Sequence, residues 1–200
     1  MCTYKYDASP DPFCYPGSNV LINKYGIKNA DRLSAVEREI TARKMLQLLE
    51  NPIHGRFGFT HLKNIHKHIF SDLYDWAGTI RTFGFISKSG TIFCRGEHID
   101  QEARRIFGAL ASENKLRSLP DYLFVERLAY YVSEINALHP FREGNGRVLR
   151  EFTRQLAMYN GYTLMWSRVP KDEILPADIA AFAKNYKPLI EVLNKALGLY

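Results

Sequence analysis

The chain has 200 residues, and its 27 lysines and arginines against 21 aspartates and glutamates give a formal net charge of +6. A chain of this length can bury about 70% of its unfolded surface in one core, so the fold needs neither disulfides nor a structural metal. Hydrophobic residues make up 46% and charged residues 24%, values that exclude a disordered, collagen-like or low-complexity protein. We expect residues 1–200 to form a single domain.

Membrane and redox signals are also missing from the sequence. The apolar runs are only a few residues long, far below the roughly 18 residues of a spanning helix, and the first residues, MCTYKYDASPD, contain no signal-peptide core. Cys2, Cys14 and Cys94 form no C-x-x-C pair, so neither a disulfide framework nor a zinc knuckle is encoded. We therefore expect a cytoplasmic protein without a membrane partner. The positive charge indicates some anionic partner without identifying it.

The N-terminal half begins with residues 1–30, which are rich in Pro, Gly, Asn and Tyr. Because a disordered tail would be poor in aromatic residues, this segment is expected to be an ordered aromatic arm that lies on the domain. Apolar residues at helical spacing predict a first helix over 31–50. They predict a second helix that has Thr60 as its N-cap and ends at Gly78.

From residue 80 to 94 the pattern changes to two β-prone runs, which predicts one hairpin with Gly90 in its turn. Helical spacing then returns in three segments, over about 98–114, 122–138 and 146–160, the last followed by Gly161 as a stop signal. The last forty residues are expected to form one or two further helices, with Pro170, Pro176 and Pro188 as breakers. The sequence thus predicts an all-α domain with one inserted β-hairpin.

Residues 138–150 carry the chemistry, in the order LHPFREGNGRVLR. A Gly-Asn-Gly turn opens the last central helix, and the N–H groups and dipole at a helix start favour an anion. Gly144 and Gly146 permit positive φ and close approach of the backbone to a ligand. Arg147 and Arg150 lie three residues apart, so we expect both to project from one side of the first helical turn toward phosphate oxygens.

Two further side chains complete this segment. His139 is a base that titrates near neutral pH, and Glu143 is the kind of single carboxylate that binds Mg²⁺ together with phosphate oxygens and water. Together these groups indicate transfer to or from a nucleotide phosphate. A P-loop is excluded because no G-x-x-x-x-G-K-[ST] occurs, and a dinucleotide fold is excluded because Leu149 stands where a third glycine is required.

The segment resembles the signature of the Fic family (Fic/Doc superfamily), H-x-F-x-[DE]-G-N-G-R-x-x-R. All eight fixed positions are met, by His139, Phe141, Glu143, Gly144, Asn145, Gly146, Arg147 and Arg150. Residues 15–19, 70–81 and 91–94 are similar to the arm, helix and hairpin of stand-alone bacterial Fic proteins. The resemblance therefore covers most of the chain and implies a Fic-type helical domain.

The resemblance implies adenylylation, in which AMP moves from ATP to a Ser, Thr or Tyr hydroxyl of a target protein and pyrophosphate is released. It implies that His139 is the general base, that Phe141 is buried and anchors the loop, and that Glu143 holds Mg²⁺ against the α- and β-phosphates. Arg147 would contact the triphosphate and Arg150 the γ-phosphate. The implied nucleotide-binding residues are Gly144, Asn145, Gly146, Arg147 and Arg150.

The hairpin over 80–94 resembles the flap of this family, which pairs with an extended target segment by strand addition. The implied docking residues are Thr82, Phe83, Gly84, Thr91, Ile92 and Phe93. Gly146 stands where the Doc branch has a lysine and transfers the γ-phosphate, so the resemblance favours AMP transfer over phosphorylation.

Many Fic proteins carry an inhibitory helix with the pattern [ST]-x-x-x-E-[GN]. No Ser or Thr of this sequence has Glu at the fourth following position, and Ser34 with Glu37 is one residue short. The resemblance thus implies the toxin of a toxin–antitoxin pair, whose separate antitoxin contacts Arg150. Its implied targets are the ATPase subunits of type II topoisomerases.

Two alternatives stay open: transfer of another phosphate-linked group, such as UMP, phosphocholine or phosphate, and a non-catalytic basic binding module. Direct nucleic-acid binding is disfavoured because no basic cluster is interleaved with aromatic residues. The spacing of His61, His66 and His68 does not place two ligands on one helix face, so no metal site is expected there. Arg142, at a variable motif position, is expected to be solvated, and Trp166 to serve in packing.

Overall fold

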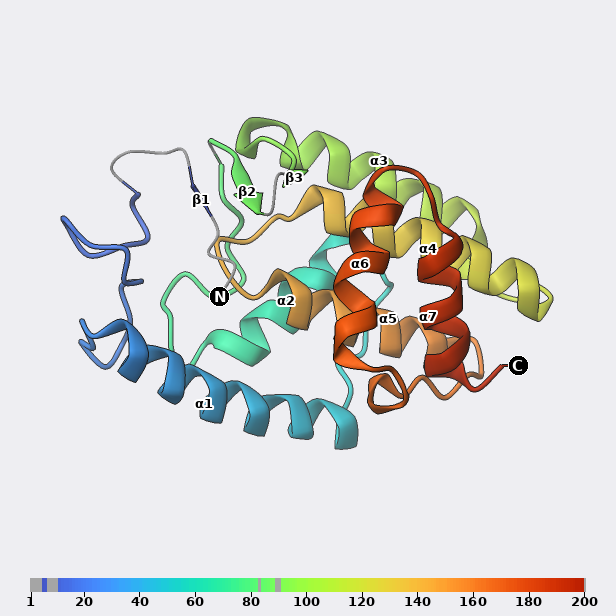
Figure 1. Ribbon diagram of the computed structural model, residues 1–200, viewed down its shortest axis with the longest axis horizontal. Helices are drawn as coiled ribbons and strands as arrows, with labels where there is room; N and C mark the ends of the chain where they lie inside the picture. The colour runs from blue at the N-terminus through green and yellow to red at the C-terminus, as the bar shows by residue number, and fades with distance from the viewer. Residues whose placement is uncertain (1–4, 7–10, 83, 89–90, 200) are drawn as a thin grey trace.

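The computed structural model describes residues 5–6, 11–82, 84–88 and 91–199. It is mainly helical, with one small sheet (Figure 1). The α-helices are α1 (Ala30–Glu50), α2 (Phe59–Phe70), α3 (Ile99–Ser112), α4 (Asp121–Leu138), α5 (Asn145–Tyr159), α6 (Lys171–Phe182) and α7 (Lys187–Leu197). Single 3₁₀ turns are η1 (Gly96–His98), η2 (Asn114–Leu116) and η3 (Trp166–Arg168), and the strands are β1 (Lys5–Tyr6), β2 (Ile86–Lys88) and β3 (Thr91–Ile92).

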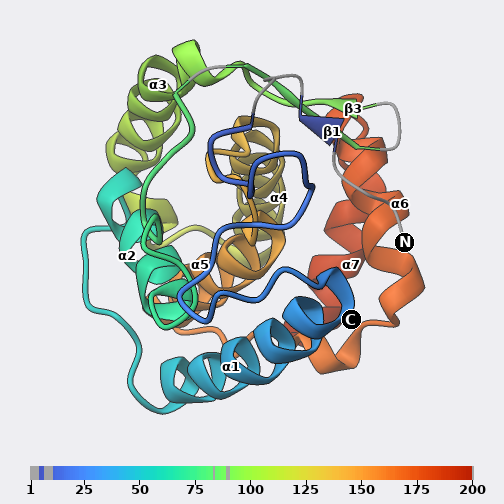
Figure 2. The same ribbon diagram turned by 90° about the vertical axis from the view of Figure 1, so that its left-hand side faces the viewer.

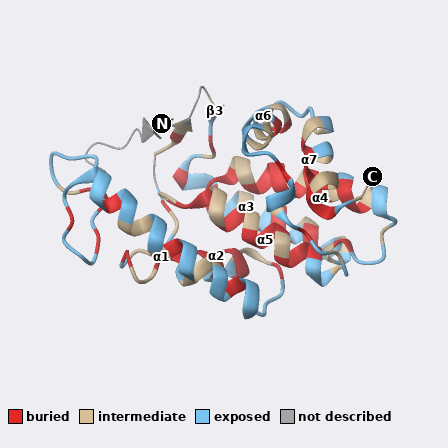
Figure 3. Ribbon diagram, turned by 60° about the horizontal axis from the view of Figure 1, so that its bottom comes forward, coloured by how far each residue is buried: buried red, intermediate tan, exposed pale blue. Residues whose placement is uncertain are grey.

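Helix α4 lies at the centre of the fold, with the other helices arranged around it (Figure 2). It contacts α3, α5, α6 and α7, and buried residues occur on all of its sides, as Figure 3 shows for α4 and α5. A helix that is apolar around most of its circumference is a core helix. The C-terminal end of α4, where the motif begins, is therefore held by packing from several directions.

Helix α1 lies along the outside, with one face toward α2 and an exposed outer face (Figure 3). Its N-cap is Asn29, whose side chain accepts a hydrogen bond from the N–H of Arg32 at 2.9 Å. Leu33, Thr41 and Leu48 form its buried side. This helix matches the expected range closely, because its caps and its spacing are both local signals.

The second helix differs from the prediction at both ends. Gly58 occupies the N-cap position and Thr60 lies within the first turn, so Thr60 is not the cap. The helix ends at Phe70, eight residues before Gly78, and the chain continues in turns. Asp72 lies in these turns and forms an ion pair with Lys44 of α1, with 3.0 Å between Nζ and Oδ2. The apolar spacing continued past the helix because the turns are themselves packed on the core.

The predicted hairpin is present as β2 and β3, which pair antiparallel with Ser87 opposite Ile92. Within the predicted hairpin range, residues 80–82, 84 and 85 are not strand, and Gly90 of the predicted turn lies outside the described residues. The N-terminal arm adds the unpredicted strand β1, which pairs antiparallel with β2 through Lys5 opposite Ser87. The sheet order is β1-β2-β3. The arm also packs on the domain, since the Phe13 and Trp76 ring centroids are 5.5 Å apart.

The three prolines of the last forty residues lie at helix starts or inside a helix, which corrects the expectation that they end helices. Pro170 is the N-cap residue of α6, and Pro188 lies in the first turn of α7, where a missing N–H costs nothing. Pro176 lies inside α6. Within the described part of the chain, no helix combines the length and apolar character that crossing a membrane requires.

Candidate active site

The motif begins at the end of α4. His139 is the C-cap residue, with φ +43° and ψ +59° in the left-handed region, a conformation that costs a non-glycine residue about 1 kcal/mol or more. The ring is buried, with 3% exposure of the residue, and stacks on Phe93 with 3.8 Å between centroids. Its Nδ1 lies 3.3 Å from the carbonyl oxygen of Asn136. Because a carbonyl only accepts, this contact assigns the proton to Nδ1 and leaves Nε2 as the basic nitrogen.

The loop between α4 and α5 is closed by Asn145. Its Oδ1 accepts from the N–H of Phe141 at 2.9 Å, and its Nδ2 donates to the carbonyl of Phe141 at 2.8 Å. Phe141 is fully buried, as expected for a loop anchor, and stacks on His66 with 3.9 Å between centroids. The Asn145 side chain is thus engaged inside the loop, and the part of this residue available to an anion is its backbone N–H at the start of α5.

His66 of α2 packs against the motif loop and hydrogen-bonds to its backbone. Its Nδ1 accepts from the N–H of Gly78 at 2.8 Å, so the proton lies on Nε2, which donates to the Glu143 carbonyl at 3.1 Å. Burial is the main reason that the pKa of His66 falls to about 3. A neutral imidazole therefore joins two backbone segments, a role that the sequence pattern did not reveal.

Gly144 and Gly146 of the motif are restricted to small size by different features of the structure. Gly144 has φ +81°, and a Cβ placed on it would lie 2.2 Å from Cζ of Phe70. No other residue fits this position without moving the core. Gly146 is helical, and its added Cβ would lie 3.4 Å from Nη1 of Arg150. The expected positive φ is therefore present at Gly144 and not at Gly146, whose small size matters because it lies in the wall of a cavity.

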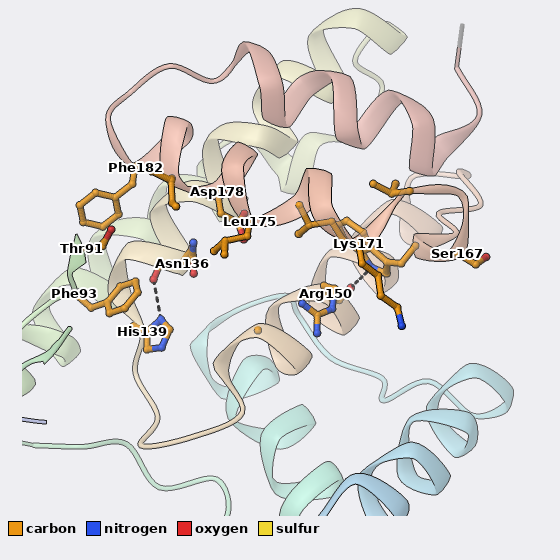
Figure 4. Close-up of a pocket in the computed structure, with 15 residues that line it drawn as sticks. Thr91, Phe93, Asn136, His139, Arg150, Ser167, Lys171, Leu175, Asp178 and Phe182 are labelled. Atoms are coloured by element: carbon orange, nitrogen blue, oxygen red, sulfur yellow. Dashed lines mark hydrogen bonds between the residues drawn. The ribbon is translucent and has the colours of Figure 1, made fainter. Parts of the chain in front are cut away.

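That cavity has a volume of about 760 Å³ and is lined by His139, Gly146 and Arg150 together with parts of the flap, α4, η3 and α6 (Figure 4). Its largest wall is α6, from which Leu175, Asp178 and Phe182 point into the cavity in Figure 4. The remaining lining residues are Thr91, Phe93, Asn136, Trp166, Ser167, Val169, Lys171, Ile174 and Ile179.

Trp166 belongs to the site and not only to packing. Its Nε1 donates to the carbonyl of Arg150 at 3.0 Å, and its ring lines the cavity. Arg150 comes from the first turns of α5 and Trp166 from η3, so this bond ties the segment after α5 to the motif. Of the predicted motif residues, His139, Gly146 and Arg150 line this cavity.

Arg147 lines a different cavity from Arg150, although their spacing predicts that both motif arginines project from one side of the first helical turn. Its Nη2 lies 2.6 Å from Oε1 of Glu37 on α1, and its Nη1 donates to Oγ1 of Thr41 at 3.2 Å. The guanidinium carbon lies 4.7 Å from the ring centroid of Phe70. A carboxylate 110 positions away in the sequence determines this orientation, and Arg147 lines a smaller cavity of about 350 Å³ against α1.

Glu143 lies beside Arg147. Its Oε1 accepts from the N–H of Gly144 at 2.8 Å and from Nη2 of Arg147 at 3.4 Å. The side chain is 26% exposed, and among the described residues none donates to its second carboxylate oxygen. No cluster of three or more His, Cys, Asp or Glu exists in the described ranges. A single accessible carboxylate fits Mg²⁺ that is bound mainly through phosphate and water, and does not fit a metal bound by the protein alone.

The six predicted flap residues fall into different environments. Thr91 and Ile92 form β3, and Ile92 is 59% exposed. Thr82 is exposed but precedes the strands, Gly84 has φ +68°, and Phe83 lies outside the described residues. The side chain of Phe93 is buried against His139, so only its backbone could pair with a target strand, and its place among the docking residues stays a prediction.

Other polar residues near the motif also have definite partners. Arg142, expected to be solvated, donates from Nε to Oδ2 of Asp11 at 2.8 Å, with side-chain exposures of 11% and 15%. The N-terminal arm is thereby attached to the motif loop. His61 is hydrogen-bonded through Nε2 to Oε1 of Gln155 at 2.8 Å.

These features agree with comparisons to known proteins. The model of the Fic/DOC family matches residues 56–157. The protein adenylyltransferase VbhT of Bartonella schoenbuchensis is 41% identical over 96% of this chain, which spans only 40% of VbhT. The probable protein adenylyltransferase Fic of Salmonella typhimurium is 36% identical over 97% of this chain and 96% of its own length.

A crystal structure of the N-terminal Fic domain of a Bartonella quintana effector, with bound ADP, superposes with a TM-score of 0.84. It is 29% identical and covers 92% of this chain and 93% of its own. The motif, the helical fold with its flap and the length of the match all lead to one assignment. The chain belongs to the Fic/DOC family.

Proposed function

We propose that this protein is a protein adenylyltransferase that moves AMP from ATP to a side-chain hydroxyl of a target protein. The main structural support for this proposal is a single cavity lined by His139, Gly146 and Arg150. The names of the relatives and the ADP bound by the Bartonella quintana domain support it.

In the proposed reaction His139 is the general base. Its Nδ1 is oriented by the Asn136 carbonyl, which directs the basic Nε2 to the target hydroxyl. The hydroxyl proton moves to Nε2 while the hydroxyl oxygen forms a bond to the α-phosphorus. The bond from the α-phosphorus to the bridging oxygen breaks, and pyrophosphate leaves with the electron pair. The stacked ring of Phe93 keeps the imidazole in one orientation.

The phosphates are proposed to bind at the start of α5. The first N–H groups of this 15-residue helix, from Asn145 onward, have no intrahelical acceptor, and the helix dipole adds positive potential there. Arg150 adds a guanidinium to the same cavity. The carboxylate of Glu143 would hold Mg²⁺, which when bound neutralises phosphate charge. A contact of Arg147 with the triphosphate requires that its ion pair with Glu37 open.

Target binding is proposed at the edge of β3. In the described sheet β1 covers the outer edge of β2, so β3 is the edge strand beside the cavity, with Thr91 in the cavity wall and Ile92 exposed. An extended target segment that pairs with Thr91 and Ile92 would place a hydroxyl near His139. We also propose, from length and cysteine content, that residues 1–200 act as one Fic domain in the cytoplasm. On the sequence resemblance we propose that a separate antitoxin contacts Arg150 and that the targets are type II topoisomerase ATPase subunits.

The test uses ATP labelled at the α- or the γ-phosphate, with Mg²⁺ and either the purified ATPase subunit of DNA gyrase or a cell lysate as acceptor. We expect protein-bound label from the α position only, with its loss in His139→Ala. His54→Ala is the matched control, since His54 is exposed and lies outside the site. Label from the γ position would indicate phosphorylation, and label from neither position would refute a transferase that uses ATP. Modification of lysate proteins but not of the gyrase ATPase subunit would refute only the topoisomerase target.

A further inference from the structure

Arg81 is a fully buried side chain, with 0% exposure, in the segment that enters the flap. Arginine is almost never fully buried unless its N–H groups are bound. Its N–H groups must therefore have acceptors close to the motif.

The donors of Arg81 reach backbone carbonyls on two sides. Toward the end of α4, Nε donates to the carbonyl of His139 at 3.0 Å and Nη2 to that of Leu138 at 3.4 Å. Toward the flap, Nη1 donates to the carbonyl of Gly84 at 3.2 Å and Nη2 also to that of Cys94. The backbone N–H of Arg81 itself donates to the carbonyl of Pro140 at 3.0 Å.

Each of these contacts has a consequence for the reacting side chain. The last carbonyls of a helix lack intrahelical donors, so a guanidinium at the end of α4 satisfies them and complements the helix dipole. The same contact fixes the peptide plane of His139, whose left-handed φ of +43° is otherwise unfavourable. Cys94 directly follows Phe93, which stacks on the His139 ring. One guanidinium thus holds both the histidine and the ring packed against it.

We propose that Arg81 is a positioning residue that couples the flap to His139, so that the docking strand β3 and the base are held in one geometry. Its role in the reaction rests on the proposed adenylyl transfer. Lysine does not replace it, because a single ammonium lacks the planar, divergent donors that reach carbonyls on two sides. The sequence offered no physical signal for this role.

The first test compares Arg81→Lys with Arg154→Lys. Arg154 is a matched control because it also donates to a backbone carbonyl, that of Leu48 at 2.9 Å, but lies away from the cavity. We expect kcat for AMP transfer to fall about tenfold or more in Arg81→Lys, as for other small misplacements of a reacting group, while the Kd for ATP changes less than about twofold. A kcat equal to that of Arg154→Lys would overturn the proposal.

The second test needs no activity and therefore separates this inference from the proposed function. In the wild-type protein, NMR should show an Arg81 Nε–H protected from solvent exchange and a cross-peak between the rings of Phe93 and His139. The ring cross-peak should be lost in Arg81→Lys and kept in Arg154→Lys. Rapid exchange of Nε–H in the wild type refutes the coupling even where Arg81→Lys fails to fold. Retained coupling in a protein that transfers no label would instead refute the proposed function.

Discussion

Replacement of Gly144 by alanine should destabilise the protein through two separable effects. Gly144 has φ +81°, a region that L-residues rarely adopt, and an added Cβ would lie 2.2 Å from Cζ and 2.3 Å from Cε2 of Phe70. Phe70 is fully buried, with its ring 4.7 Å from that of His66 and 6.2 Å from that of Tyr74, centroid to centroid. Because these rings surround it, Phe70 cannot move aside without disturbing the core.

The expected magnitude is the sum of the two effects. A left-handed conformation costs a non-glycine residue about 1–2 kcal/mol, and an extra methyl group in a packed core costs about 1–3 kcal/mol. Gly144→Ala should therefore lower the free energy of unfolding by about 2–5 kcal/mol. For a chain of this size each kcal/mol lowers the Tm by about 2–4 °C.

Gly161→Ala is the matched control, because it follows the other end of α5 with φ +87° and has no atom within 4 Å of the added Cβ. It should lose only the conformational part, about 1–2 kcal/mol. Urea unfolding of both variants measures the difference directly. In a Phe70→Leu background the extra cost of Gly144→Ala should shrink, since leucine vacates part of the contact, and the double-mutant cycle isolates that coupling.

Equal losses in the two alanine variants would contradict this prediction, because they would mean that the Phe70 ring moves aside without an energetic cost. A loss in Gly144→Ala that Phe70→Leu does not reduce would place the strain elsewhere in the loop. The outcome bears on function as well, since Gly144 is the N-cap residue of α5, where the phosphates are proposed to bind.

Three further predictions concern the same loop. Gly146→Lys should weaken ATP binding about tenfold or more by filling the cavity beside Arg150, whereas Gly108→Lys, at an exposed helical glycine with open space, should leave calorimetric ATP affinity unchanged. Burial lowers the pKa of His66 to about 3, so the stabilising contribution of this neutral side chain is complete above the unfolded pKa near 6.5 and is lost as the pH falls below that value. Between pH 7 and 5 the free energy of unfolding, measured with urea, should fall by about 2 kcal/mol more in the wild type than in His66→Gln. Parallel losses in the two proteins would contradict this. Glu37→Gln should cost about 1–3 kcal/mol by leaving Arg147 without its main carboxylate, and an unchanged urea midpoint would show that this ion pair contributes nothing.

The parts of the structure that local signals determine were predictable from the sequence. The existence of the central helices, the hairpin and the helix start at the Gly-Asn-Gly turn all follow from spacing, caps and turn residues. The end of α2 was not predictable in this way. Apolar residues such as Leu73 continue the helical spacing beyond Phe70 but are buried from a turn. Periodicity reports which side chains are buried and not which backbone conformation buries them.

Contacts between distant segments explain the other differences. Strand β1 and the pair of Asp11 with Arg142 join the N-terminal arm to the flap and to the motif loop, and the latter pair is 131 positions apart in the sequence. Neither contact has a local signature, because the arm contains mainly turn-forming and aromatic residues. His66 and Arg81 were missed for the same reason, since each acts through backbone carbonyls that any residue could supply.

The motif arginines illustrate how one distant carboxylate changes a functional inference. A spacing of three residues places Arg147 and Arg150 on neighbouring parts of α5, yet Arg147 lies 2.6 Å from Glu37. Glu37 is itself held by the hydroxyl of Tyr74, whose pKa is raised above its ordinary value by burial and by this carboxylate, so the hydroxyl remains a donor. The charge of Arg147 is thus compensated within the protein. In the proposed function, a triphosphate that reaches Arg147 must therefore displace Glu37. Of the two arginines, Arg150 is the one that lines the cavity with His139.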